Sequence, residues 1–196
     1  MRRQDLTELH FIAPISNAVS MLRRGILSNR LAERVPHESV ALAAVQDVRS
    51  EILVPGGRPL HDYANLYFNA RNPMMFKRRS RHEDLAILRV STDVLDLAGV
   101  VITDANAASD YRRFEGAPEG IAIVDDALTF AKDWRHANRI DYYRHKSAMC
   151  AEVLVPGSVH PRFIGGAYVS GPAGRTNLAE VGFDRPATEN PDLFFQ

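Results

Sequence analysis

The strongest structural signal in this chain is a pair of apolar stretches joined by a short helical segment. Residues 85–90 (LAILRV) have the clearest pattern of a strand, and residues 100–103 (VVIT) return to strand. Between them, Ser91 can cap a short helix that ends at Gly99. This alternation of strand, helix and strand predicts an α/β (α+β) fold.

Length and composition fit one folded domain. The chain has 196 residues, which is enough for one domain with a sizeable core and too few for two domains of typical size. Hydrophobic residues make up 45% and charged residues 24%, which excludes a wholly disordered or fibrous protein. We expect one domain over residues 1–180. For residues 181–196 we expect an acidic tail, either loose or packed as one strand on the body.

Further segments continue the mixture of strands and helices. We expect strands over residues 9–13, 64–69, 148–156 and 162–170. Apolar spacing over residues 15–26, closed near Gly25, predicts one helix, and the pattern that opens at Pro36 predicts a second. Arg49 lies just beside the apolar stripe of this second helix, where a side chain can face a cleft. Asn72 followed by Pro73 predicts the start of another short helix.

Neither a membrane span nor a metal site is predicted. No stretch approaches about 18 consecutive apolar residues, and the first ten residues lack the apolar core of a signal peptide, so we expect a cytoplasmic protein. Cys150 is the only cysteine, which excludes an internal disulfide framework and a multi-cysteine zinc site. The seven histidines form no metal-binding pattern, and neither of two common glycine-rich phosphate loops is present.

Two segments carry groups that an ordinary core strand does not require. His61 and Asp62 begin a stretch rich in tyrosine, arginine and methionine, which is either a site or a strand with a buried His-Asp pair. Glu152 stands in an apolar strand, and a buried carboxylate is costly unless it is paired, so this residue marks either a site or an exposed edge. Cys150 is a weak candidate nucleophile because no histidine lies beside it in the sequence.

Two basic runs could bind a polyanion although Lys plus Arg and Asp plus Glu are both 24 and the formal net charge is zero. Residues 71–81 hold five cations and no acid, and residues 132–146 interleave basic residues with Trp134, Tyr142 and Tyr143. Cations beside aromatic rings are typical of a groove for single-stranded nucleic acid. The alternative is a solvated helix face.

The order of four motifs resembles the DarT family of DNA ADP-ribosyltransferase toxins. The motifs are LHFIAPISN, VQDVRSEILVPGG, LHDYANLYFNARNPMMF and a late AEVLV, within residues 8 to 156. The resemblance implies an ADP-ribosyltransferase fold, a split mixed β-sheet with flanking helices that clasps NAD as the consumed co-substrate. It also implies transfer of ADP-ribose to a base, closer to the thymidine-modifying than the guanosine-modifying branch, in single-stranded DNA. This reaction releases nicotinamide and blocks replication.

The resemblance also assigns residues to this reaction. It implies that Arg49 and Glu152 are the catalytic pair. It places the NAD site at His10, Phe11, Ile12, Val19, Leu27, Arg49 and Tyr67, and DNA contacts at Arg71, Met74, Lys77 and Arg78. Glu152 would stabilise the positive charge that develops on the ribose, as carboxylates do in glycosidases. Arg49 would bind the diphosphate or assist deprotonation of the base, although an arginine is normally always protonated.

A separate macrodomain-type antitoxin is implied as a partner by the same resemblance, since no macrodomain lies in this chain. Two other functions stay open: an NAD-dependent ADP-ribosyltransferase acting on RNA or protein, and a non-catalytic module that binds single-stranded nucleic acid. The stretch Asp192-Leu193-Phe194 resembles the end of peptides that dock into sliding clamps, but Asn190-Pro191 replaces the usual glutamine-led start. The segment 105–147 has no secure match to the family, which leaves the base choice open.

Overall fold

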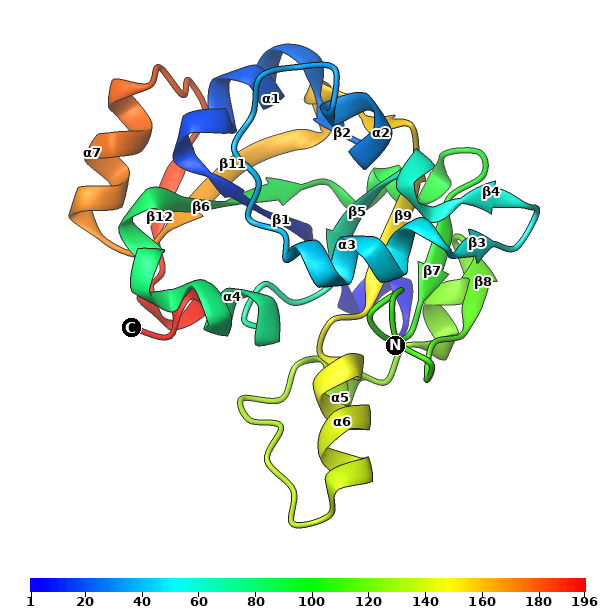
Figure 1. Ribbon diagram of the computed structural model, residues 1–196. Coiled ribbons are helices and arrows are strands. Elements are labelled where there is room, and N and C mark those ends of the chain that lie inside the picture. Colours follow the sequence, from blue (N-terminus) through cyan, green and yellow to red (C-terminus); the bar gives the residue numbers. More distant parts are fainter.

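A mixed eight-stranded sheet organises the molecule, whose computed structural model describes residues 1–196 (Figure 1). The strand order is β12-β11-β6-β1-β5-β9-β7-β8, and every pair is antiparallel except β11 with β12. The strands are β1 (Leu9–Pro14), β5 (Tyr63–Tyr67), β6 (Leu85–Val90), β7 (Val101–Thr103), β8 (Phe114–Gly116), β9 (Glu152–Pro156), β11 (Ile164–Val169) and β12 (Ala187–Glu189). The predicted α/β fold is confirmed.

Helices flank this sheet on both faces. They are α1 (Ala18–Arg24), α2 (Asn29–Ala32), α3 (Ala43–Ser50), α4 (Pro73–Arg78), α5 (Asp126–Thr129), α6 (Arg139–Ala148) and α7 (Pro172–Glu180). Two small pairings complete the fold, β2 (Ile26–Leu27) with β10 (Ser158–Val159) and β3 (Leu53–Val54) with β4 (Arg58–Pro59). Figure 1 shows α1 on one side of the sheet and α4 on the other, while α6 projects from the body.

Alternating side chains divide the core between the two faces of the sheet. The larger cluster holds 27 buried residues, among them Leu66 and Val153, and α1 packs against it through Ala18. The smaller cluster holds eight, among them Tyr67 and Met75 of α4. Leu66 and Tyr67 are neighbours on β5 and therefore face opposite sides. Each fully buried large aliphatic side chain contributes about 1.5–3 kcal/mol.

The two strands that carried the clearest sequence signal are present but do not pair with each other. β6 and β7 are separated in the sheet by β1, β5 and β9, and a 3₁₀ helix over Thr92–Asp96 begins the connection. The Ser91 hydroxyl accepts a hydrogen bond from the Asp93 amide at 3.2 Å, so the predicted cap is confirmed. The two strands run in the same direction, but the connection crosses three other strands rather than joining neighbours.

The predicted helix boundaries are partly confirmed. α1 ends where Gly25 adopts φ 86°, and a Cβ at this position would lie 2.2 Å from the carbonyl oxygen of Val159. The helix expected from Pro36 is wrong over its first turns, because α3 begins only at Ala43. The Asn17 side chain instead bonds both backbone groups of Glu38, at 2.7 and 3.0 Å, which holds residues 36–42 in an irregular segment across the molecule.

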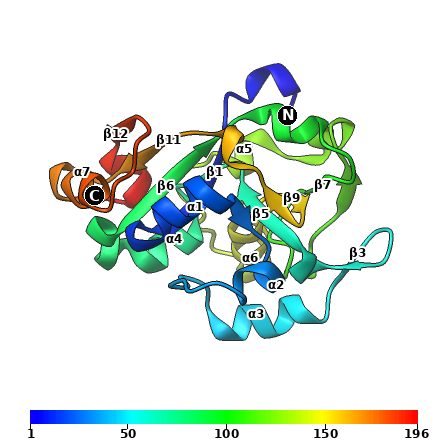
Figure 2. The same cartoon turned by 90° about the horizontal axis from the view of Figure 1, so that it is seen from above.

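The C-terminal segment is part of the fold rather than a loose tail. β12 extends the sheet beside β11, as Figure 2 shows at the end near α7, and a 3₁₀ helix over Pro191–Phe194 follows. Phe194 has no exposed surface and packs in the smaller cluster. The domain boundary expected at residue 180 is therefore not seen. The physical reason is that the apolar side chains of Leu193, Phe194 and Phe195 are covered by the body of the domain. Of the two expectations for the segment, packing as a strand on the body is the one that matches the structure.

The buried position of Phe194 also bears on the sliding-clamp resemblance. A docking peptide must present its aromatic side chain to the partner, whereas this side chain is covered by the sheet and α4. Asp192 is also engaged, 3.4 Å from the guanidinium of Arg71. In this structure the Asp192-Leu193-Phe194 stretch is not available as a docking peptide.

Candidate active site

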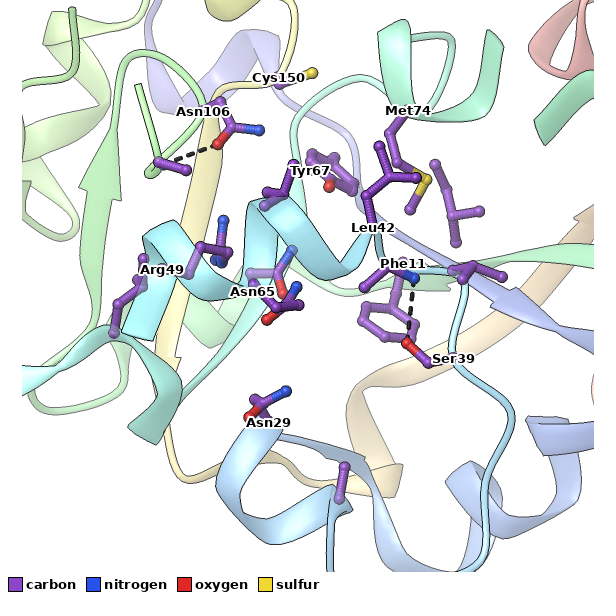
Figure 3. Close-up of a pocket in the computed structure, with 18 of the residues that line it drawn as sticks. Phe11, Asn29, Ser39, Leu42, Arg49, Asn65, Tyr67, Met74, Asn106 and Cys150 are labelled. Carbon is purple, nitrogen blue, oxygen red and sulfur yellow. Dashed lines mark hydrogen bonds between the residues drawn. The ribbon is translucent and has the colours of Figure 1, made fainter. Parts of the chain in front are cut away.

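A cavity of about 610 Å³ lies between the central strands and the segment that contains α2 and α3. Its floor is formed by β1 and β5, and its sides by α3, α4 and α6. Figure 3 shows Arg49, Asn65, Tyr67 and Phe11 around this space, with Met74 and Leu42 near one side. The volume lies in the usual range for a small-molecule or cofactor site. About half of the lining residues are hydrophobic.

Arg49 and Glu152 form a buried ion pair in the wall of this cavity. The two guanidinium nitrogens of Arg49 donate to the two carboxylate oxygens of Glu152, each at 3.0 Å, and the backbone amide of Ala107 donates to Glu152 Oε1 at 3.1 Å. The Arg49 side chain is 8% exposed and the Glu152 side chain 0%. Arg49 lines the cavity, and Glu152 lies behind it.

Strand register and helix packing bring this pair together. Glu152 is the first residue of β9, opposite Tyr67 of β5 on one side and Thr103 of β7 on the other. Its position in the middle of the sheet fixes the carboxylate, and α3 crosses above it with Arg49 on its inner face. Of the two alternatives for Glu152, a site or an exposed edge, the exposed edge is therefore wrong, because the side chain is paired and buried in the middle of the sheet.

Burial changes the acidity of the neighbouring groups. Burial works against the charged form of Arg49, but attraction to and hydrogen bonding by Glu152 outweigh it and raise the Arg49 pKa. Burial, reinforced by the negative charge of Glu152, raises the pKa of Cys150 to about 12 and also raises the pKa of Tyr67. Arg49 thus stays positively charged, and the Cys150 thiol is a poor nucleophile at neutral pH.

His61 also lines the cavity and offers a free nitrogen. Burial and the positive charge of Arg49 lower its pKa, which keeps the ring neutral near pH 7. Its Nε2 is buried without a hydrogen-bond partner. Asp62 lies 3.1 Å from Arg30 rather than on His61, so the alternative of a buried His-Asp pair is not what the structure has.

The residues assigned to NAD by resemblance divide into two groups. Phe11, Ile12, Leu27, Arg49 and Tyr67 line the cavity. His10 and Val19 do not belong to its lining. The His10 ring is hydrogen-bonded to the carbonyl of Phe68 at 3.2 Å and to Glu8 at 3.3 Å.

The residues assigned to DNA divide in the same way. Met74, Lys77 and Arg78 of α4 line the cavity, but the Arg78 guanidinium is bound to the Val40 carbonyl. Arg71 lies outside the lining and donates to the carbonyls of Lys132 and Asp192, at 2.6 and 3.0 Å. Lys77 is the cation of this group with no hydrogen bond or ion pair within the protein.

Several lining residues were not singled out as site residues from the sequence. They are Asn29, Asn65, Asn106 and Tyr111, together with Tyr143 and Lys146, which belong to the basic and aromatic run at 132–146. Asn65 stands on the same strand face as Tyr67 and Tyr63, so the alternation of β5 could have identified it. Tyr143 and Lys146 share one face of α6, whereas Asn29, Asn106 and Tyr111 come from a helix end or from loops, where no periodic pattern indicates a direction.

No helix is long and apolar enough to cross a membrane. No group of three or more His, Cys, Asp or Glu side chains is arranged to hold a metal ion.

Comparison with known proteins identifies the family. A family model described as ssDNA thymidine ADP-ribosyltransferase, DarT, matches residues 10–195. A DNA ADP-ribosyl transferase-DNA ADP-ribosyl glycohydrolase fusion protein of Thermosipho africanus is 34% identical to this chain over an alignment of 202 residues. The alignment covers 96% of this chain and 49% of that protein. The chain thus spans about half the length of this relative.

Solved structures share the fold. Thermus sp. 2.9 DarT in complex with ADP-ribosylated ssDNA aligns with a TM-score of 0.83 at 23% identity, over 97% of both chains. The same protein in complex with NAD+ aligns with a TM-score of 0.79 at 22% identity, over 97% of this chain and 98% of that one. Because the family model covers nearly the whole sequence, this protein belongs to the DarT family of ssDNA thymidine ADP-ribosyltransferases.

Proposed function

We propose that this chain transfers ADP-ribose from NAD to a thymidine base in single-stranded DNA and releases nicotinamide. The buried Arg49–Glu152 pair in the wall of a cofactor-sized cavity carries the proposal. The family model and two solved structures of Thermus sp. 2.9 DarT, one in complex with NAD+ and one with ADP-ribosylated ssDNA, support it. We also propose that the reaction takes place in the cytoplasm, where both DNA and NAD are available.

The cavity fits a dinucleotide. Its volume and mixed lining suit a ligand with flat rings and charged phosphates, and Phe11 and Tyr67 offer aromatic surface. Arg49 and Lys77 supply positive charge for a diphosphate. The unpartnered Nε2 of His61 is a polar atom that a ligand hydroxyl or amide would satisfy.

Glu152 would act on the ribose that carries the bond to nicotinamide. When bound, NAD supplies an ADP-ribosyl group whose bond to nicotinamide breaks with positive charge developing on the ribose. The Ala107 amide and the position on β9 hold this carboxylate independently of Arg49, so that it can oppose the charge once it is uncovered. Arg49 covers Glu152 on the cavity side, so a ribose hydroxyl reaches the carboxylate only when this guanidinium shifts.

Arg49 is better suited to phosphate binding than to proton removal. Its raised pKa keeps the guanidinium charged, and a charged guanidinium cannot accept the proton of a base nitrogen. A shift from Glu152 toward the diphosphate would exchange one anionic partner for another. The same movement would uncover the carboxylate as NAD enters, which couples binding to activation of the site.

A toxin role and a partner that reverses the reaction complete the proposal. The relative from Thermosipho africanus is described as a fusion of a DNA ADP-ribosyl transferase with a DNA ADP-ribosyl glycohydrolase. Its length is about twice the matched part. We therefore propose that an ADP-ribosyl glycohydrolase of the macrodomain type acts as antitoxin to this chain.

One incubation tests the reaction. Purified protein, NAD and a thymine-containing single-stranded oligonucleotide should give an adduct one ADP-ribose heavier by mass spectrometry, together with free nicotinamide. An oligonucleotide without thymine serves as the matched control and should stay unmodified. Modification of RNA or protein in place of DNA would move the chain to another acceptor class, and binding without NAD consumption would make it a non-catalytic module.

A further inference from the structure

Two surface segments that are far apart in the sequence meet beside the cavity. Lys77 of α4 and Lys146 of α6 both belong to its lining. Trp134, in the loop before α6, packs edge to face on Phe76 of α4, with the ring centroids 5.4 Å apart. Hydrogen bonding by Trp134 and the positive charges of Lys146 and Lys77 lower the pKa of Tyr142. The two basic runs noted in the sequence therefore form one surface.

One face of α6 carries only cations and aromatic rings. Arg139, Tyr142, Tyr143 and Lys146 recur at spacings of three and four residues, so they share a face. The Lys146 ammonium lies 5.4 Å from the centroid of Tyr142, and the Arg139 guanidinium lies 5.9 Å from that of Tyr143. The acid of this helix, Asp141, does not fall at these spacings. The surface is thus complementary to a polyanion.

The rings at the outer end of this surface pack edge to face on one another. Phe195 packs edge to face on both Phe76 and Trp134, at centroid distances of 5.1 and 6.2 Å. The guanidinium of Arg71 lies 4.1 Å from the Phe195 ring, and that of Arg79 lies 4.0 Å from the Phe76 ring. Phe76 remains 37% exposed and Tyr143 47%. Arg79 therefore lies over the Phe76 ring, and the part of this ring that stays exposed is what a base can contact.

Single-stranded nucleic acid is the occupant that matches this chemistry. An unpaired strand has phosphates for the lysines and unstacked bases for the rings, whereas a duplex hides the faces of its bases. The surface begins at Lys77 and Lys146, which also line the cavity, and leads outward over Tyr142 and Trp134 to Phe76. A strand bound here would keep one base at the cavity and its neighbours outside.

We propose that Phe76, Trp134 and Tyr142, with Lys77 and Lys146, form a binding track for the nucleotides that flank the modified base. This inference rests on the proposed function and deepens it by assigning where the strand runs on this chain. The exposed part of each ring can contact a base, and the two lysines can contact phosphates beside the cavity. The track explains a zero net charge together with DNA binding, since the positive charge is concentrated where the strand lies.

Intrinsic fluorescence gives a direct test, because Trp134 is the only tryptophan in the chain. Titration with an eight-nucleotide single strand that contains thymine should quench the tryptophan emission in a saturable way, and the quenching should weaken as salt rises. A mononucleotide should have much less effect because it cannot reach the cavity and the track together. The same samples are assayed for the ADP-ribose adduct.

Single substitutions locate the track. Tyr142→Ala should weaken oligonucleotide binding on the order of tenfold, while Tyr142→Phe, which keeps the ring, should bind nearly as the parent does. Lys77→Ala and Lys146→Ala should each lower the slope of log affinity against log salt by about 0.7. Arg175→Ala is the control, because Arg175 is an exposed arginine on α7 in an ion pair with Glu189.

The possible outcomes separate this inference from the proposed function. Unchanged emission together with normal modification of the same strand would overturn the track and leave the function intact. Quenching without modification of any strand would uphold the track and overturn the proposed reaction. Equal effects of Arg175→Ala and Tyr142→Ala would also overturn the track, since the response would then not depend on its residues.

Discussion

Two regions of the molecule meet at the cavity and are built in opposite ways. The sheet side places Arg49, Glu152 and Tyr67 under cover, with the ion pair 8% and 0% exposed. The α4–α6 side presents Lys77, Tyr143 and other exposed side chains from helices and loops. A reaction that develops charge is favoured by charged groups shielded from water, whereas a flexible strand needs accessible rings and cations. The structure thus separates a buried chemical half from an accessible binding half.

Glu152→Gln should have the largest effect and should fall on the chemical half alone. Removing the carboxylate charge should lower the rate of adduct formation by about 10²–10³-fold, since electrostatic groups at a developing charge contribute this much. It also leaves Arg49 buried without an ionic partner, which costs about 3–5 kcal/mol in the free energy of unfolding. Mass spectrometry of the oligonucleotide and thermal unfolding measure the two effects.

Glu189→Gln is the matched control for this substitution. Glu189 pairs with Arg175 at 3.2 Å on the surface, where an ion pair contributes about 0–1 kcal/mol. The division into two halves would be wrong if the two variants lost equal activity. It would also be wrong if Glu152→Gln abolished oligonucleotide binding.

Arg49→Lys sharpens the comparison within the chemical half. A lysine keeps the charge but cannot make both hydrogen bonds to Glu152, so the carboxylate loses one fixed contact. If Arg49 binds the diphosphate, KM for NAD should rise by about tenfold, as expected for the loss of a charge-assisted hydrogen bond of about 1.5 kcal/mol, while KM for the oligonucleotide stays within about twofold. A larger rise in KM for the oligonucleotide would place Arg49 on the acceptor instead.

Arg71→Ala should distinguish a structural cation from a binding one. Arg71 ties the 132 loop and the C-terminal segment together through the carbonyls of Lys132 and Asp192, so its loss should cost about 1–2 kcal/mol of stability. Hydrogen exchange over residues 190–196 should increase in the same variant. Lys77→Ala should leave the melting temperature unchanged and weaken oligonucleotide binding. If instead Lys77→Ala lowered the melting temperature and Arg71→Ala weakened only binding, Arg71 would be the binding cation and Lys77 the structural one.

The sheet side should also lose stability at acidic pH through Glu8. Burial works against its charge, but hydrogen bonds from His10, Arg89 and Tyr168 outweigh this and lower the pKa of Glu8 from 4.5 to about 2. A carboxylate with a lower pKa in the folded chain stabilises it above about pH 4.5, and this contribution is lost as the pH falls toward 2. Glu8→Gln should flatten the unfolding free energy over this interval, and an unchanged profile would contradict the assignment.

Cys150 should give the smallest effect of all. The raised pKa, about 12, leaves almost no thiolate at pH 8, and the side chain is buried. Iodoacetamide should therefore label the folded chain slowly and the unfolded chain quickly, and Cys150→Ser should retain most of the transfer activity. Rapid labelling of the folded chain would show that the chemical half opens more than its buried pairs indicate.

The sequence by itself determined the type of fold and most strands, and it singled out Glu152 as an unusual residue. Apolar runs mark β6 and β11. Asn72 caps α4 by accepting hydrogen bonds from the amides of Met74 and Met75. Glu152 stands out as an acid in an apolar strand. These features depend on neighbours along the chain, where hydrogen bonding and side-chain direction have a fixed period. Residue order was enough for them.

Only the tertiary structure decided what each cation does. The basic run at 71–81 reads as uniform in sequence, yet Arg71 holds a loop, Arg78 holds Val40, and Lys77 faces the cavity. The partners of these side chains lie 38 to 121 residues away, and no local pattern records such distances. The pairing of Arg49 with Glu152 is of the same kind, because strand register and the crossing of α3, rather than spacing along the chain, bring the two charges together.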